Sequence, residues 1–298
     1  MKDVSSHTVA TRATRTASLV VLLLVVAVSG AVGQSLWSLS DGRSAASLEI
    51  MSSSFNTGPE QSLSSYVVVF SKVWVPSPRV RLVGDLPIGY AKASRTCYGS
   101  YCYRYGYGSE TCTALGNPYL GAHFLFGDNP LSYLEVGGRL PVAKERLYRF
   151  EELGMIADTD RLGWFASNLL IGHIALNWGE KIDRGFVWAM RVGPMLAMTK
   201  GCCGGGAALN LQYGTRVGLD NGKVHVGAGV SGILGLTASG ADLSERTVHT
   251  FACRFGVRTS VVEPSLMLRV PLDQDAAWGG LCRYTVSIGL TVPIETKG

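Results

Sequence analysis

The chain has 298 residues and a formal net charge of +5, and only 16% of its residues are charged. Its length suits one large domain or two small ones, and low charge with 37 glycines is typical of a β protein. A net charge this small argues against a nucleic-acid partner.

The first 33 residues have the three parts of a secretory signal peptide. Three basic residues precede an apolar core at 19–28, and Ala31-Val32-Gly33 then places small residues where a signal peptidase reads them. The core is too short for a transmembrane helix, which needs about 20 apolar residues. We expect cleavage after Gly33, which lowers the net charge to +3 because the leader carries three positive charges and one negative.

Long alternating segments make up the rest of the chain. In the last one, 284–294, apolar residues occupy the even positions, while small or polar residues and Pro293 occupy the odd ones. Alternation over about eleven residues matches a tilted membrane strand, whereas strands of soluble proteins average about five or six residues. The sequence predicts twelve strands, an even number as is usual for outer-membrane barrels: 46–54, 65–75, 79–90, 117–127, 131–141, 167–178, 185–197, 207–219, 223–237, 247–259, 263–272 and 283–294.

The connections between these segments are alternately short and long. Short turns such as Pro76-Ser77-Pro78 and Asp220-Asn221-Gly222 follow every second strand. Short periplasmic turns and longer external loops are typical of barrels in the bacterial outer membrane, whereas a soluble sandwich explains only the alternation. We therefore predict an all-β fold, a transmembrane antiparallel up-and-down β-barrel at 46–294, with a periplasmic segment at 34–45 and a tail at 295–298.

Outward-facing aromatic residues are expected at both ends of the strands, as in interfacial girdles. Beside the short turns these are Phe126, Trp178, Phe186 and Trp188, and at the opposite ends Tyr90 and Tyr284. In the loop after the fifth strand, apolar residues recur every three positions from Leu147 to Ile156, which predicts a short amphipathic helix. It would either cover the mouth or pack on the rim.

Six of the seven cysteines fall at the predicted external side, an oxidising location. Loop-stapling disulfides are therefore expected among Cys97, Cys102, Cys112, Cys202, Cys203 and Cys282. The spacing of Cys97 and Cys102 also suits a metal site, but no paired histidines accompany it, so neither a metal nor another cofactor is expected.

Strand parity predicts a charged barrel interior. The predicted lumen-lining residues are Glu49, Lys72, Arg81, Asp85, Glu135, Arg139, Arg191, Arg216, Arg254, Arg258 and Arg269. Eight are positive and three negative. Because unpartnered charges are costly at membrane depth, they must face carboxylates, water or a solute. Both a salt-bridged plug and an anion-favouring pore fit. If Asp85 and Glu135 neutralise Arg191 and Arg254, the remaining arginines still leave the wall positive.

Signals for catalysis are weak. Outer-membrane phospholipases of twelve strands carry His-x-Ser on one strand face, and none of the five histidines begins that motif. His123, His173 and His225 are expected to point inward as polar lumen residues, and no phosphate loop or zinc motif is present. We expect no catalytic residues; a lipid-modifying enzyme is the weaker alternative.

Several short motifs recur at strand ends: Gly116-Asn117-Pro118-Tyr119-Leu120-Gly121, Gly84-Asp85-Leu86-Pro87, Gly138-Arg139-Leu140-Pro141 and Leu268-Arg269-Val270-Pro271-Leu272. With them the chain resembles the outer-membrane transporters of phenol-degradation meta-pathway operons. One departure is the C-terminus, Ile294-Glu295-Thr296-Lys297-Gly298, because many outer-membrane barrels end on an aromatic residue.

The resemblance implies a channel for small, hydrophobic molecules. With the lumen charges, it leads us to expect a passive outer-membrane channel for small hydrophobic or anionic solutes. The alternative is a closed structural or adhesive barrel that displays cysteine-rich loops. The expected partners are outer-membrane lipids, the barrel-assembly machinery and a small solute.

Overall fold

The computed structural model of this protein describes residues 43–55, 61–95, 108–143, 163, 165–182, 185–199, 206–237, 242–273 and 282–294. The predicted signal peptide, most of the segment at 34–45, the predicted loop helix and the tail at 295–298 lie outside these residues. No helix in the described parts of the chain is long and apolar enough to cross a membrane.

The described residues form one antiparallel sheet. Its strands are β1 (Ala45–Phe55), β2 (Gln61–Ser77), β3 (Val80–Arg95), β4 (Gly108–Leu115), β5 (Tyr119–Leu125), β6 (Tyr133–Arg139), β7 (Leu169–Lys181), β8 (Phe186–Thr199), β9 (Gly206–Asp220), β10 (Val224–Gly235), β11 (Thr247–Val257), β12 (Glu263–Pro271) and β13 (Cys282–Pro293). A short 3-10 helix, η4 (Leu243–Glu245), precedes β11.

Strands β4 and β5 act as one strand of the barrel. Both pair with β3, where Ile88 lies opposite Leu115 and Asp85 opposite Tyr119. The ladder is interrupted at Gly116-Asn117-Pro118, since proline has no backbone N–H to donate. The prediction of a twelve-stranded antiparallel barrel is therefore confirmed.

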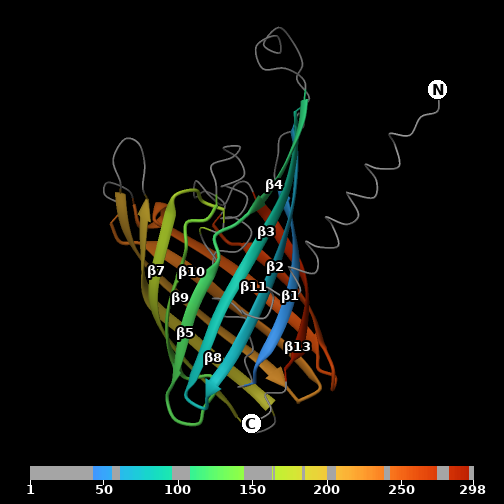
Figure 1. The fold of residues 1–298 in the computed structure, drawn as a ribbon, viewed down its shortest axis with the longest axis vertical. Helices are drawn as coiled ribbons and strands as arrows, with labels where there is room; N and C mark the ends of the chain where they lie inside the picture. Colours follow the sequence, from blue (N-terminus) through green and yellow to red (C-terminus); the bar gives the residue numbers. More distant parts are fainter. Residues whose placement is uncertain are drawn as a thin grey trace, which may run out of the picture.

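The sheet closes on itself into a barrel. The first strand β1 pairs with the last strand β13, with Ile50 opposite Ile288, and β2 pairs with β3 on the other side of β1. Figure 1 shows β1 in blue beside β13 in dark red. Closure satisfies the backbone hydrogen bonds within the barrel, as a membrane-spanning sheet requires.

Strands β2, β3 and β4 extend beyond the rest of the barrel at one end, which is the upper end in Figure 1. The short turns that follow β2, β5, β7, β9 and β11 gather at the opposite end. One of these turns is held by its own side chains, because Asn221 accepts hydrogen bonds from the N–H groups of Lys223 and Val224. Gly222 in this turn has φ +86°, a conformation that favours glycine.

The two faces of the wall have opposite polarity. Outward-facing Trp178, Leu219 and Ile288 are each about 60% exposed, whereas charged Arg139 and Glu135 on the inner face are buried. A soluble protein has the reverse arrangement, because exposed apolar surface is unfavourable in water. The apolar exterior therefore indicates that the barrel spans a membrane.

Aromatic side chains lie on this outer surface near both ends. Trp178 and Trp188 contact each other edge to face beside a short turn, with ring centroids 5.6 Å apart. At the other end Tyr66 and Tyr90 lie 6.4 Å apart. Their positions fit the interfacial girdles of membrane barrels.

Candidate functional site: the barrel interior

The inner wall carries most of the charged residues that the sequence places there. Those with side chains on the inner face are Glu49, Arg81, Asp85, Glu135, Arg139, Arg191, Arg216, Arg254, Arg258 and Arg269. They come from strands around the whole barrel, because each strand sends alternate side chains inward.

Lys72 is a correction to the prediction. In β2 the buried residues are at odd positions, Val67, Val69 and Val73 among them, so Lys72 shares the outer face with the half-exposed Trp74. The strand is apolar on both faces over 66–70, so its alternation could not show which face points inward. The structure explains this pattern, because the inner face of β2 packs against an apolar side chain described below.

Glu135 is the centre of a buried polar cluster formed by β5, β6, β7 and β8. The Tyr119 hydroxyl donates a hydrogen bond of 2.7 Å to Glu135 Oε1, and His173 Nε2 lies 3.0 Å from the same oxygen. Arg191 Nη2 lies 3.4 Å from Oε2, and His123 Nε2 3.6 Å from it. One carboxylate of β6 thus contacts groups from three neighbouring strands, β5, β7 and β8, and Arg191 is one of the two arginines that the sequence analysis considered as partners of Asp85 and Glu135.

A second buried ion pair lies next to this cluster. Arg139 donates hydrogen bonds of 2.9 and 3.2 Å to the two carboxylate oxygens of Asp85, and the guanidinium carbon lies 5.4 Å from the centre of the Tyr119 ring. Asp85, Tyr119 and Arg139 occupy one row of the sheet, since Tyr119 pairs with both of the others. Asp85 therefore binds Arg139, and neither Arg191 nor Arg254, the two arginines considered as its partners from the sequence.

The interruption between β4 and β5 brings a buried amide into the interior. Asn117 Nδ2 donates to the carbonyl oxygens of Gly163 and Ala166 at 2.8 and 2.7 Å, and its Oδ1 accepts from the Ala143 N–H at 2.8 Å. These partners belong to the two ends of the β6–β7 connection. Asn117 thus fastens that connection to the inner wall.

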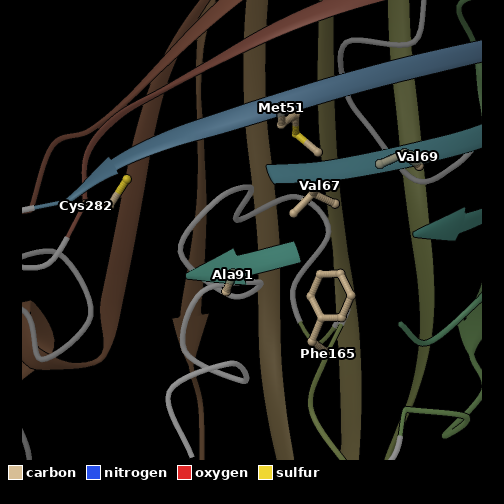
Figure 2. Close-up of a cluster of buried hydrophobic side chains, with 6 residues drawn as sticks. All are labelled: Met51, Val67, Val69, Ala91, Phe165 and Cys282. Atoms are coloured by element: carbon tan, nitrogen blue, oxygen red, sulfur yellow. The ribbon is translucent and has the colours of Figure 1, made fainter. Parts of the chain in front are cut away.

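Phe165, from the same connection, packs inside the barrel against the opposite wall. Its neighbours are Met51 of β1, Val67 and Val69 of β2, Ala91 of β3 and Cys282 of β13. Figure 2 shows the Phe165 ring facing the strands that carry Val67 and Ala91. The ring is 3% exposed, so it fills part of the barrel's cross-section.

A third charged group lies at the β1–β13 seam. Arg269 Nη2 is 3.1 Å from Glu49 Oε1, and Nη1 donates to Ser287 Oγ at 3.1 Å. This ion pair joins β12 to β1 across β13. It therefore ties the first strand of the barrel to the last ones.

The end of the barrel with short turns holds a more open charged group. Arg258 Nε lies 3.2 Å from Glu263 and its Nη1 3.5 Å from Asp220, which also contacts Lys181 at 3.3 Å. Glu263 further approaches Arg254, at 3.9 Å, and His225, at 3.5 Å.

Sequence reasoning missed several residues of the interior. Glu263 has the same parity as the inward-facing Arg269 in β12, and Tyr119 has the same parity as the inward-facing His123 in β5. Alternation alone could therefore have placed both residues inside. Nothing in the sequence placed Phe165 inside, because its position depends on how a connection packs. No group of three or more His, Cys, Asp or Glu in the described residues is arranged to hold a metal ion.

One polar chain lies on the outer face instead. His249 Nδ1 is 3.0 Å from Asp273, and its Nε2 is 2.6 Å from the Tyr213 hydroxyl. The Tyr213 ring crosses Gly232 to reach His249, and a Cβ at Gly232 would lie only 2.8 Å from that ring. The chain lies near the end of the barrel opposite the short turns.

The described cysteines differ from the disulfide prediction. Cys112 and Cys282 are free thiols, as is Cys253. Cys282 faces the barrel interior, where its sulfur lies 3.8 Å from the Thr285 hydroxyl, so it does not meet another loop. The remaining candidates, Cys97, Cys102, Cys202 and Cys203, lie outside the described residues.

This architecture is shared with solved structures of known proteins, although the sequence comparisons found no match. No family model and no curated protein match the sequence. An outer-membrane channel from Pseudomonas putida F1 is 12% identical with a TM-score of 0.52, covering 86% of this chain and 97% of that one. The chain folds as an outer-membrane β-barrel. The transport unit of the autotransporter AIDA-I from Escherichia coli has the same fold, with 9% identity, a TM-score of 0.50, and coverage of 89% of this chain and 93% of that one.

Proposed function

We propose that this barrel is a narrow passive channel of the bacterial outer membrane and that it favours small anions. The observation that carries the proposal is the charge of the inner wall. Among the described residues, the inward-facing arginines Arg81, Arg139, Arg191, Arg216, Arg254, Arg258 and Arg269 outnumber the carboxylates of the same wall, Glu49, Asp85, Glu135, Asp220 and Glu263. Positive side chains lower the energy of an anion in a narrow, poorly screened space.

The fold supports a channel role, because the structurally similar protein from Pseudomonas putida F1 is an outer-membrane channel. The polar interior supports it as well. A barrel that only needs to be stable can be filled with apolar side chains, which often serve stability as well as or better than buried ion pairs.

The middle of the interior is constricted. Side-chain contacts bury the charged groups of the Glu135 cluster and of the Asp85–Arg139 pair. Phe165 packs across the interior, close to the point where Asn117 binds the β6–β7 connection. We therefore expect a small conductance and exclusion of large solutes.

The same constriction favours a second candidate function, a closed structural or adhesive barrel that displays its external loops. Buried, ion-paired side chains such as Arg139 and Asp85 would then serve as a plug.

Reconstitution in planar bilayers separates the two candidates. The channel proposal expects discrete current steps and a reversal potential of anion-selective sign in a salt gradient. A barrel that inserts into the bilayer without any conductance would support the closed alternative.

A further inference from the structure

A cavity lies inside the barrel beside the β9–β10 turn, separate from the residues that bind Glu135. Gly218 and Gly227 face each other across two neighbouring strands and leave part of the inner wall bare. A Cβ built on Gly227 would meet only one atom, the Val217 carbonyl oxygen at 3.3 Å. The side chains around this hollow are those of Val187, Arg216, Asp220, His225 and Arg254.

Arg216 stands out among the lining residues. It is 8% exposed, its Nε atom has no hydrogen-bond partner, and it makes no ion pair in the described part of the chain. Arg254, which also lines the cavity, lies near enough to repel it electrostatically.

The carboxylates nearby are already engaged. Asp220 contacts Lys181 and Arg258, and Glu263 contacts Arg258, Arg254 and His225. Three cationic side chains, Lys181, Arg254 and Arg258, thus share these two carboxylates. Arg216 adds a fourth positive charge without an ion pair in the described residues, which leaves an excess of positive charge around the hollow. A buried positive charge is costly unless a counter-charge or hydrogen-bond acceptors accompany it.

We propose that this cavity binds the carboxylate of a small organic anion. A guanidinium fork matches the two oxygens of a carboxylate, so Arg216 can bind it through two parallel hydrogen bonds. His225 also lines the hollow, but its Nδ1 lies 3.5 Å from Glu263, so Arg216 is the group that recognises the carboxylate. Val187 and the bare backbone at Gly218 and Gly227 supply an apolar wall for the carbon chain of the anion.

This inference names the solute class of the proposed channel and to that extent rests on the proposed function. Binding itself does not require conduction, so the two are tested separately. The probe is butyrate, with 1-butanol as the uncharged analogue and chloride as a simple anion, each added to the refolded full-length barrel in detergent.

The first measurement is the thermal unfolding midpoint, followed by the heat-dependent shift in gel migration. At ten times its dissociation constant, butyrate should favour the folded state about elevenfold and raise the midpoint. Butanol should have no such effect. Equal protection by chloride at the same concentration would overturn the assignment to a carboxylate.

Two variants locate the effect. Arg216→Met should abolish the response to butyrate without lowering the midpoint in its absence, because it removes a buried charge that lacks an ion-pair partner. Gly227→Val keeps every charge but fills the hollow, so it too should abolish the response to butyrate. If Arg216→Met does not fold, Gly227→Val alone tests whether butyrate binds in this cavity. Arg79→Met, an exposed arginine of the β2–β3 turn at the same end, is the matched control and should respond as the wild type does.

A wild-type response in both Arg216→Met and Gly227→Val would overturn the proposed site. A barrel that binds butyrate without conducting would contradict the channel function alone. Conduction without butyrate binding would contradict only this inference.

Discussion

Arg139 of β6 binds Asp85 of β3 across the intervening β5, through two hydrogen bonds of 2.9 and 3.2 Å, with both side chains buried. The Tyr119 ring lies beside the Arg139 guanidinium, and the Tyr119 hydroxyl donates a hydrogen bond to Glu135. The two charged groups therefore form one connected network, and the loss of one member should affect the others.

Asp85→Asn should destabilise the barrel by about 3–5 kcal/mol, because it leaves the Arg139 guanidinium buried without its counter-charge. Urea unfolding in lipid vesicles, followed by tryptophan fluorescence, measures the change. Adding Arg139→Met to Asp85→Asn should recover much of the loss, since it removes the stranded charge. A single variant within about 0.5 kcal/mol of the wild type, the usual range for surface changes, would contradict this account of the pair.

Phe165→Ala should raise the single-channel conductance, because it removes the ring that packs across the interior. It should also lower stability by about 3–5 kcal/mol, the usual range for truncation of a buried phenylalanine. Phe255→Ala is the control, since that ring lies on the outer face and is 46% exposed. If both variants had the same conductance as the wild type, Phe165 would not be part of the constriction.

Replacement of inward arginines should reduce anion selectivity. The double variant Arg81→Gln and Arg254→Gln removes two positive charges from the inner wall, and reversal potentials in a salt gradient should move toward zero. The outward-facing change Val286→Ala should leave them unaltered. An unchanged reversal potential in the double variant would show that these arginines do not determine selectivity.

The Asp273–His249–Tyr213 chain should stabilise the outer face without taking part in transport. His249→Ala should lower stability by about 1–3 kcal/mol, because it leaves polar partners unsatisfied. Its reversal potential should equal that of the wild type. Hydrolysis of phospholipid by the purified barrel, lost in His249→Ala, would instead support the enzyme alternative.

Cys282 should resist a maleimide reagent in the folded barrel, because its thiol is buried in the interior. Intact-protein mass spectrometry before and after urea unfolding measures its labelling. The same experiment without reductant tests the remaining prediction of a disulfide among Cys97, Cys102, Cys202 and Cys203. Seven labelled thiols in the unfolded, unreduced protein would contradict that prediction.

Most of the architecture follows from alternation. Strand β13 carries apolar residues on one face and small or polar residues on the other, so its alternation shows which face points toward the lipid. The same rule places Arg139, Glu135 and Arg191 inside. It fails at Lys72, because β2 is apolar on both faces where it packs against Phe165.

The partners within the interior could not be predicted in this way. Parity gives the face of a residue but not its height relative to residues on other strands. Asp85 was therefore considered as a partner of Arg191 or Arg254, although it shares a row with Arg139. Likewise, the position of Phe165 depends on the hydrogen bonds that Asn117 makes to the β6–β7 connection. These are contacts between segments far apart in the chain, for which alternation carries no information.

The reversal potential of the wild-type barrel in a potassium chloride gradient tests the central claim most directly. The arginine-rich inner wall predicts a value of anion-selective sign that weakens as ionic strength rises, since salt screens the wall charges. A cation-selective reversal potential would contradict the proposed role of these arginines.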